Sequence, residues 1–224
     1  AERRQSADDL VQLLTPVVKA FLTDEGFNNS NLGLQVLGGS GFTTDWPLEQ
    51  LVRDGRIARI YEGTNGIQAM DLLGRKLGLN GGKPIMALLN EVQKTIATAK
   101  TLPVTSELAA KVDEALNKLG EAAMHMGKNA MSPKVMEAFA FAYPFMEVFG
   151  DVATAWMLLW RATIAAQKLE KGAKKKDAAF YEGQIKSAEF FAYSILPVTL
   201  GKINAILADN DAVIKISEDA FGGK

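Results

Sequence analysis

Apolar residues recur along the chain at the three- and four-residue spacing of α-helices, and strand-like alternation is almost absent. The pattern predicts a first helix from about Ser6 to Leu37, with a possible interruption at Gly26-Phe27-Asn28-Asn29 and an end at the turn Gly38-Gly39-Ser40-Gly41. Asp45-Trp46-Pro47 predicts the start of a second helix, because proline suits the first helical turn, and this helix closes near Tyr61.

A third helix is expected to begin at Thr64, which is a favourable N-cap, and to reach about Leu77. The glycine-rich segment 78–84 that follows is the clearest linker in the sequence. Beyond it, the apolar pattern predicts longer amphipathic helices over Ile85–Ile96 and Leu108–Met126, the second after the start signal Thr105-Ser106.

Two more helices complete the second half of the chain. Ser132-Pro133 predicts the start of one that is kinked at Pro144 and runs to about Lys171. After a solvated turn over 171–176, the last helix carries Tyr181 to Ile195 and is kinked or ended by Pro197. The sequence therefore predicts an all-α chain in two parts, residues 1–77 and residues 84–224, the second of which is an antiparallel bundle.

The composition limits which kinds of binding and catalytic site the chain can form. The chain has 25 basic and 26 acidic residues, so no basic surface for nucleic acid is indicated. It has no cysteine and one histidine, His125, which indicates neither a metal site nor a cysteine or serine–histidine nucleophile. If the protein performs acid–base chemistry, we expect a carboxylate to do it.

The sequence predicts no membrane span, because the most apolar stretch, Val152 to Trp160, is short and lies between Asp151 and Arg161. The first residues lack both an initiator methionine and the apolar core of a signal peptide. We therefore expect the chain to be the interior of a longer, cytoplasmic polypeptide.

Three features between positions 34 and 76 are candidates for a site. Glu62 lies in a break between helices and is followed by glycine, so its carboxylate can project into a cleft. Thr64-Asn65-Gly66 opens a helix whose free N–H groups suit a phosphate or ribose, and Gly38–Gly41 permits close approach of a ligand. Each also has a simpler interpretation, as a solvated charge, a structural N-cap and a helix C-cap respectively.

Three segments in this order resemble the C-terminal signature of the acyl-CoA dehydrogenase family. They are a glutamine-x-x-glycine-glycine turn over Gln35-Val36-Leu37-Gly38-Gly39, the helical pair Arg53-Asp54, and the run Ile60-Tyr61-Glu62-Gly63-Thr64-Asn65-Gly66-Ile67-Gln68. The resemblance covers roughly residues 15–77. It departs from the family pattern at Gly66, where many members carry glutamine, and at Gly55, where alanine is common.

The resemblance implies a role for each motif residue. Glu62 would be the catalytic base that removes the α-proton of an acyl-CoA thioester while the β-hydride leaves for FAD, and Gly63 would contact the substrate. Thr64, Asn65 and Gly66 would contact the FAD of the same subunit. The turn formed by Gln35, Val36, Leu37, Gly38 and Gly39 would contact the FAD of a neighbouring subunit.

The same resemblance implies the setting of the site. The fold would be the end of the family's C-terminal helical bundle, followed by an accessory bundle similar to the extension of larger bacterial acyl-CoA dehydrogenases, including those acting on 3-methylmercaptopropionyl-CoA. The family's N-terminal helical domain and middle β-domain would lie outside this chain, so the chain alone would be inactive. A homo-oligomer, with a dimer favoured, and an electron-transferring flavoprotein as partner are expected.

Two other functions stay open. The chain can be a catalytically incomplete helical interaction or oligomerisation module, which flavin colour would distinguish from an enzyme. It can also be an idle relative with a nucleic-acid role, although the balanced charge and the presence of Glu62 argue against this.

Overall fold

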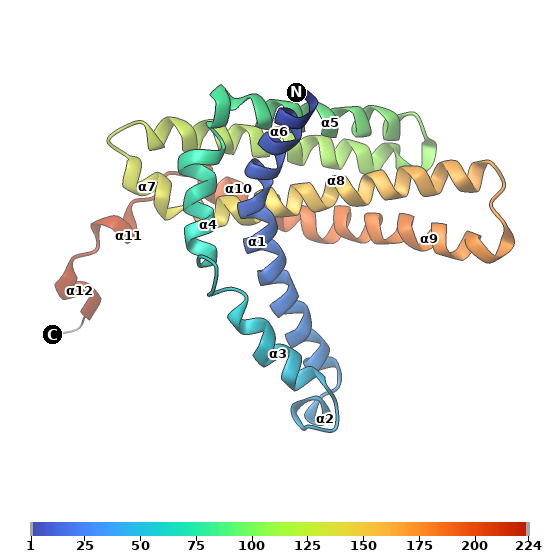
Figure 1. Ribbon diagram of the computed structural model, residues 1–224, viewed down its shortest axis with the longest axis horizontal. Helices are drawn as coiled ribbons and strands as arrows, with labels where there is room; N and C mark the ends of the chain where they lie inside the picture. The colour runs from blue at the N-terminus through green and yellow to red at the C-terminus, as the bar shows by residue number, and fades with distance from the viewer. Residues whose placement is uncertain (1, 223–224) are drawn as a thin grey trace.

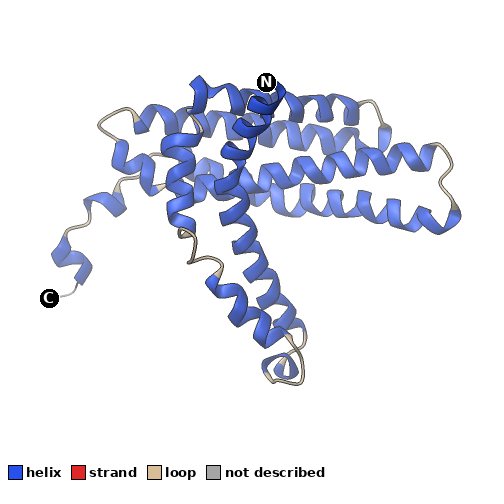
Figure 2. Ribbon diagram, viewed as in Figure 1, coloured by secondary structure: helices blue, strands red, loops and turns tan. Residues whose placement is uncertain are grey.

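The computed structural model of the chain describes residues 2–222, and all regular structure within that range is helical (Figure 2). Figure 1 shows long helices lying side by side, crossed by the N-terminal helix, and an arm that projects away from them. The prediction of an all-α chain is confirmed.

Helix α1 (Glu2–Val36) runs without a break, so the predicted interruption at Gly26–Asn29 is wrong. Glycine and asparagine disfavour helix by less than about 1 kcal/mol each, and tertiary packing outweighs this. The buried positions Leu13, Val17, Ala20 and Asp24 form one stripe that faces the rest of the protein. An acidic residue thus occupies a position on the apolar face of this helix.

The arm consists of the second half of α1, the short helix α2 (Gly39–Phe42) and helix α3 (Leu48–Ile57) (Figure 1). The turn at Gly38 ends α1 as predicted, although Gly39–Phe42 adds one helical turn. A side chain at Gly41 would lie 2.5 Å from the Leu34 carbonyl oxygen, which explains the glycine there. Helix α3 ends at Ile57 rather than near Tyr61.

Helix α4 (Asn65–Asp71) begins at the predicted N-cap and continues into a π-helical turn, η1 (Leu72–Lys76). A 3₁₀ turn, η2 (Leu79–Gly82), follows, in which Asn80, Gly81 and Gly82 all have positive φ. These left-handed positions break the helix where the linker is predicted.

The second half begins with α5 (Lys83–Lys100) and α6 (Pro103–Ala130), which pack against each other. Helix α6 starts two residues before the predicted signal Thr105-Ser106. The Thr105 hydroxyl is buried and donates to the Ala99 carbonyl oxygen at 2.8 Å, which joins the two helices at their connection.

The helix predicted from Ser132 to Lys171 is instead two helices, α7 (Val135–Ala140) and α8 (Ala142–Glu170), which separate at Phe141. The predicted kink at Pro144 is wrong, because Pro144 lies in the first turn of α8, where its missing N–H would have no helical acceptor. The aromatic residues of this segment are mostly core, since Phe145 and Phe149 are buried, whereas Trp160 is half-exposed and stacks on Trp156.

The last long helix runs from Lys175 to Leu207 as α9 (Lys175–Phe190), a π-helical turn η3 (Phe191–Ile195) and α10 (Leu196–Leu207). The turn precedes Pro197 and accommodates it without ending the helix. By length and composition this helix is able to cross a membrane, and 28% of its most apolar window is buried. Length and composition do not by themselves separate a span from a bundle helix. Short helices α11 (Ala212–Lys215) and α12 (Glu218–Gly222) follow.

The two halves of the chain pack together through α8, which contacts both α1 and α4. At the crossing of α1 and α8, a Cβ atom on Gly150 would lie 2.2 Å from the Phe21 ring. The absence of a side chain at Gly150 therefore sets how closely α1 approaches the bundle.

Gly150→Ala should lower the free energy of unfolding by about 1–3 kcal/mol, because the added methyl group forces the Phe21 ring or the helix itself to move. Gly183→Ala is the matched control, since Gly183 is an exposed position of α9 with no atom within 4 Å of the added methyl group. We expect that change to stabilise the chain by about 0.5–1 kcal/mol. Urea unfolding of the chain measures both, and equal stabilities of the two variants would contradict the account of the α1–α8 contact.

Candidate active site

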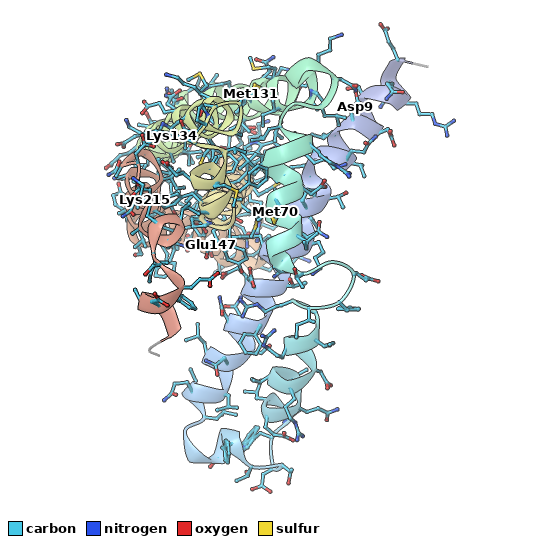
Figure 3. All side chains as sticks on the ribbon, turned by 90° about the vertical axis from the view of Figure 1, so that its left-hand side faces the viewer. Asp9, Met70, Met131, Lys134, Glu147 and Lys215 are labelled. Atoms are coloured by element: carbon cyan, nitrogen blue, oxygen red, sulfur yellow. The ribbon has the colours of Figure 1, made fainter. Side chains whose placement is uncertain are left out.

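Glu62 lies in the segment Ile60–Thr64 between α3 and α4, here called the Glu62 loop. Glu62 and Gly63 both have positive φ, 56° and 84°. For glutamate this conformation is unfavourable, and such strain persists only where the surroundings impose it. Figure 3 shows the loop bulging away from α1, below Met70 on α4. The Glu62 side chain is exposed in the chain.

Four hydrogen bonds fix the course of the Glu62 loop. The backbone N–H of Asn65 donates to the Arg59 carbonyl oxygen at 3.2 Å and closes the loop. The Gln68 side chain donates to the Glu62 carbonyl oxygen at 3.3 Å, and Lys19 Nζ donates to the Gly63 carbonyl oxygen at 2.7 Å. The Thr64 hydroxyl oxygen accepts from the Ile67 amide at 3.3 Å, which confirms Thr64 as the N-cap of α4. The backbone beside Glu62 is therefore held from both α1 and α4.

Gly63 and Gly66 are the two glycines of this loop and of the start of α4. A side chain at position 63 would meet Gln68 Nε2 at 2.9 Å, whereas Gly66 is exposed in the first turn of α4. Thr64 is exposed as well. Next to Glu62, Thr64 thus presents a small side chain, and the neighbouring Tyr61 and Ile67 present large, exposed side chains.

The Asn65 side chain points inward, into α1, and Asn65 is 4% exposed. Its Nδ2 atom donates to Asp24 Oδ1 at 2.9 Å and to the Ala20 carbonyl oxygen at 3.1 Å, and its Oδ1 atom accepts from Lys19 Nζ at 2.8 Å. Asn65 can therefore face a ligand only with its backbone.

Asp24 is the centre of a polar cluster that the sequence analysis missed. Besides Asn65, its carboxylate binds Arg59, whose guanidinium lies over the Phe27 ring at 5.4 Å, and the hydroxyl of Tyr143 on α8. Burial and, next, the hydrogen bond to Asp24 raise the pKa of Tyr143. The pKa of Arg59 is raised above all by its hydrogen bond to Tyr143. The one sequence signal was the position of Asp24 on the apolar stripe of α1.

The Gln35–Gly39 turn lies at the far end of the arm (Figure 1). Helix α3, of ten residues and therefore about 15 Å long, separates it from the Glu62 loop. Gln35, Val36, Gly38 and Gly39 are exposed and Leu37 is half-buried. Within one chain, the structure does not bring this turn and Glu62 together.

Two other titratable residues have local partners. Asp54 accepts from Gln50 at 3.4 Å, while the adjacent Arg53 pairs with Glu49. The Nε2 atom of His125 lies 2.9 Å from Asp209 Oδ1. The Asp209 carboxylate also pairs with Lys134, whose hydrogen bond lowers the pKa of Asp209.

Two family models match the chain on either side of the linker. Residues 1–77 match the model described as acyl-CoA dehydrogenase, C-terminal domain, and residues 88–217 match the model described as acetyl-CoA dehydrogenase C-terminal like. The first of these ranges contains the three motif segments between Gln35 and Gln68.

Similar proteins include three bacterial dehydrogenases. A 3-methylmercaptopropionyl-CoA dehydrogenase of Ruegeria pomeroyi is 32% identical over 96% of this chain and 36% of its own length. A butyryl-CoA dehydrogenase of Syntrophomonas wolfei is 29% identical over 97% of this chain and 36% of its own length. A broad-specificity linear acyl-CoA dehydrogenase of Mycobacterium tuberculosis is 30% identical over 93% of this chain and 35% of its own length.

The chain thus spans only about a third of the length of these relatives and aligns along almost all of its own length. With the two matched models, which together extend over most of residues 1–217, this shows that the chain belongs to the acyl-CoA dehydrogenase family.

Proposed function

We propose that the chain serves as the C-terminal part of an FAD-dependent acyl-CoA dehydrogenase, in which Glu62 is the catalytic base. The observation that supports this most strongly is the Glu62 loop itself. The exposed Glu62 is the first of two consecutive residues with positive φ, and hydrogen bonds from α4 and α1 hold the carbonyl oxygens of Glu62 and Gly63. A surface glutamate with no such role would not need this constrained backbone.

The proposed step is removal of a proton from the α-carbon of an acyl-CoA thioester. The Cα–H bond breaks, its proton goes to a Glu62 carboxylate oxygen, and the 2,3 double bond forms as the β-hydride departs. FAD, when bound, supplies the acceptor of that hydride. Gly63 would contact the thioester through its backbone, and closure of the site would exclude water from the base.

The residues at the start of α4 fit a flavin on the same surface. Thr64 and Gly66 are exposed, and Asn65 keeps only its backbone on this side because its side chain is turned into α1. We propose that these three residues contact FAD through backbone atoms and the Thr64 side chain.

We further propose a homo-oligomer, with a dimer favoured, in which the Gln35–Gly39 turn contacts the FAD of the neighbouring subunit. The separation of this turn from Glu62 within one chain supports this arrangement, as does the exposure of the apolar side chains Val36 and Phe42 near the tip of the arm. Transfer of electrons to an electron-transferring flavoprotein, in the cytoplasm, completes the proposal.

We expect the complete enzyme to purify with bound FAD and to convert acyl-CoA to the 2,3-enoyl-CoA, and residues 1–224 alone to do neither. Flavin absorbance and mass spectrometry of the CoA product measure the two properties. A complete protein that is colourless and leaves acyl-CoA unchanged would contradict the proposal in favour of a helical interaction module. Flavin and turnover in residues 1–224 alone would contradict the assignment of most cofactor contacts to other parts of the enzyme.

A further inference from the structure

The helices after the linker have no role in the proposed reaction, yet one of them contacts the Asp24 cluster beside the Glu62 loop. Tyr143, in the first turn of α8, donates its hydroxyl hydrogen to Asp24 Oδ2 on α1. The close approach of Gly150 to Phe21 lies along the same pair of helices. Tyr143 therefore belongs to a tight contact between α1 and α8.

Asp24 connects Tyr143 to both ends of the Glu62 loop. Its Oδ1 atom accepts from Asn65 Nδ2 at 2.9 Å and pairs with Arg59 Nε. Arg59 and Asn65 are the residues that close the loop, through the hydrogen bond from the Asn65 amide to the Arg59 carbonyl oxygen. A single carboxylate thus holds the residues on either side of Glu62, and Tyr143 holds that carboxylate.

The Asp24 carboxylate at the centre of the cluster is buried and paired. Asp24 is 6% exposed, and the guanidinium of Arg59 neutralises it. Lys19 joins from the solvent side, on Asn65 Oδ1 and the Gly63 carbonyl oxygen. Hydrogen bonds in such surroundings are strong, and a partly broken network is costly, so the cluster favours one geometry of the loop.

We propose that Tyr143 is a positioning residue for proton abstraction. This inference rests on the proposed function, in which Glu62 is the base. Through Asp24, it fixes the ends of the Glu62 loop and hence the place of the carboxylate relative to the substrate. The helices after the linker would then contribute to catalysis, because Tyr143 on α8 helps to position the base.

The hydroxyl of Tyr143 is the part that matters, because a phenylalanine would keep the ring in the α1–α8 contact. Loss of the hydroxyl leaves Asp24 with one donor fewer. A displacement of the base by about 1 Å lowers a rate by about 10²-fold. A partial loosening of the loop should therefore be visible in the rate of the chemical step.

The test uses the complete flavoenzyme with Tyr143→Phe, mixed anaerobically with acyl-CoA in a single turnover. We expect the rate constant of flavin bleaching to fall about tenfold or more, with FAD content and the acyl-CoA dissociation constant unchanged. The control is Thr95→Val, which removes another hydrogen bond to α8, the one from Trp156 Nε1 to Thr95 Oγ1 at 2.9 Å, but has no link to the loop. Its rate constant should equal that of the wild type.

If Tyr143 has only a structural role, less enzyme is folded, so the amplitude of bleaching falls while the rate constant stays unchanged. This result would overturn the inference. Glu62→Gln, measured in parallel, separates the two levels of the account. If Glu62→Gln bleaches normally, the proposed function fails. If it does not bleach while Tyr143→Phe bleaches at the wild-type rate, only the positioning role fails.

Hydrogen–deuterium exchange of residues 1–224 gives a second readout that needs no cofactor. Tyr143→Phe should speed exchange of the amides of residues 60–66 relative to Thr95→Val. Equal exchange in the two variants would also overturn the inference.

Discussion

Replacing Asp24 by alanine should lower the free energy of unfolding of the chain by about 3 kcal/mol or more. Removal of one partner of a buried ion pair is typically worth about 3–5 kcal/mol, because the remaining charge stays buried without compensation. Arg59 keeps some access to solvent, with 28% of its side chain exposed, so we expect the lower part of that range. The Tyr143 hydroxyl and one Asn65 donor lose their acceptor as well.

Asp113→Ala is the matched control for this stability measurement. Asp113 also joins two helices, through Lys100 and Gln93, and the hydrogen bond from Lys100 lowers its pKa, but the pair lies at the surface. Surface ion pairs contribute about 0–1 kcal/mol. Urea unfolding of both variants therefore distinguishes a central cluster from an ordinary helix–helix pair, and equal losses would show that Asp24 has no special place in the fold.

Glu62→Gln in the complete enzyme should lower turnover by about 10²–10⁴-fold or more, which is the usual contribution of general-base catalysis. Glutamine keeps the size of glutamate and much of its hydrogen bonding but cannot accept the α-proton. The nearest acidic residue along the chain is Asp54, which lies on α3 and accepts a hydrogen bond from Gln50. Asp54→Asn is therefore a suitable control, and we expect its steady-state turnover with an artificial electron acceptor to stay near that of the wild type.

Much of the fold follows from local patterns in the sequence. Thr64 as an N-cap, Pro84 in the first turn of α5 and the left-handed residues Asn80 to Gly82 are where the sequence analysis predicts a start or a break. These features depend on the backbone preferences of single residues, which are readable without knowledge of tertiary contacts.

The errors arise where tertiary packing overrides such preferences. The Gly26–Asn29 segment looks like an interruption, yet α1 continues through it because α1 packs on several other helices. Pro144 looks like a kink, but the break three residues earlier, at Phe141, places it in a helical first turn where proline is tolerated.

The support of the Glu62 loop was not predictable for a different reason. Tyr143 and Asp24 are separated by 119 positions along the chain, and nothing in either local sequence indicates the other. Tyr143 is one of several aromatic residues in its segment, and the predicted contact of Asn65 with FAD gives no indication that the Asn65 side chain turns inward. The motif indicates the position of the proposed base, whereas the contact of Tyr143 with Asp24 depends on the crossing of α1 and α8.

The central claim is that Glu62 removes the α-proton, and anaerobic mixing of the Glu62→Gln enzyme with acyl-CoA tests it most directly. A titration of acyl-CoA binding and a measurement of flavin content accompany the experiment, so that loss of chemistry is distinguished from loss of ligand. The account predicts that the variant retains FAD and binds acyl-CoA, while its flavin fails to bleach on the time scale of the wild type. Bleaching at a rate near that of the wild type would contradict the assignment of Glu62 as the base, and loss of flavin would show that the residue is structural.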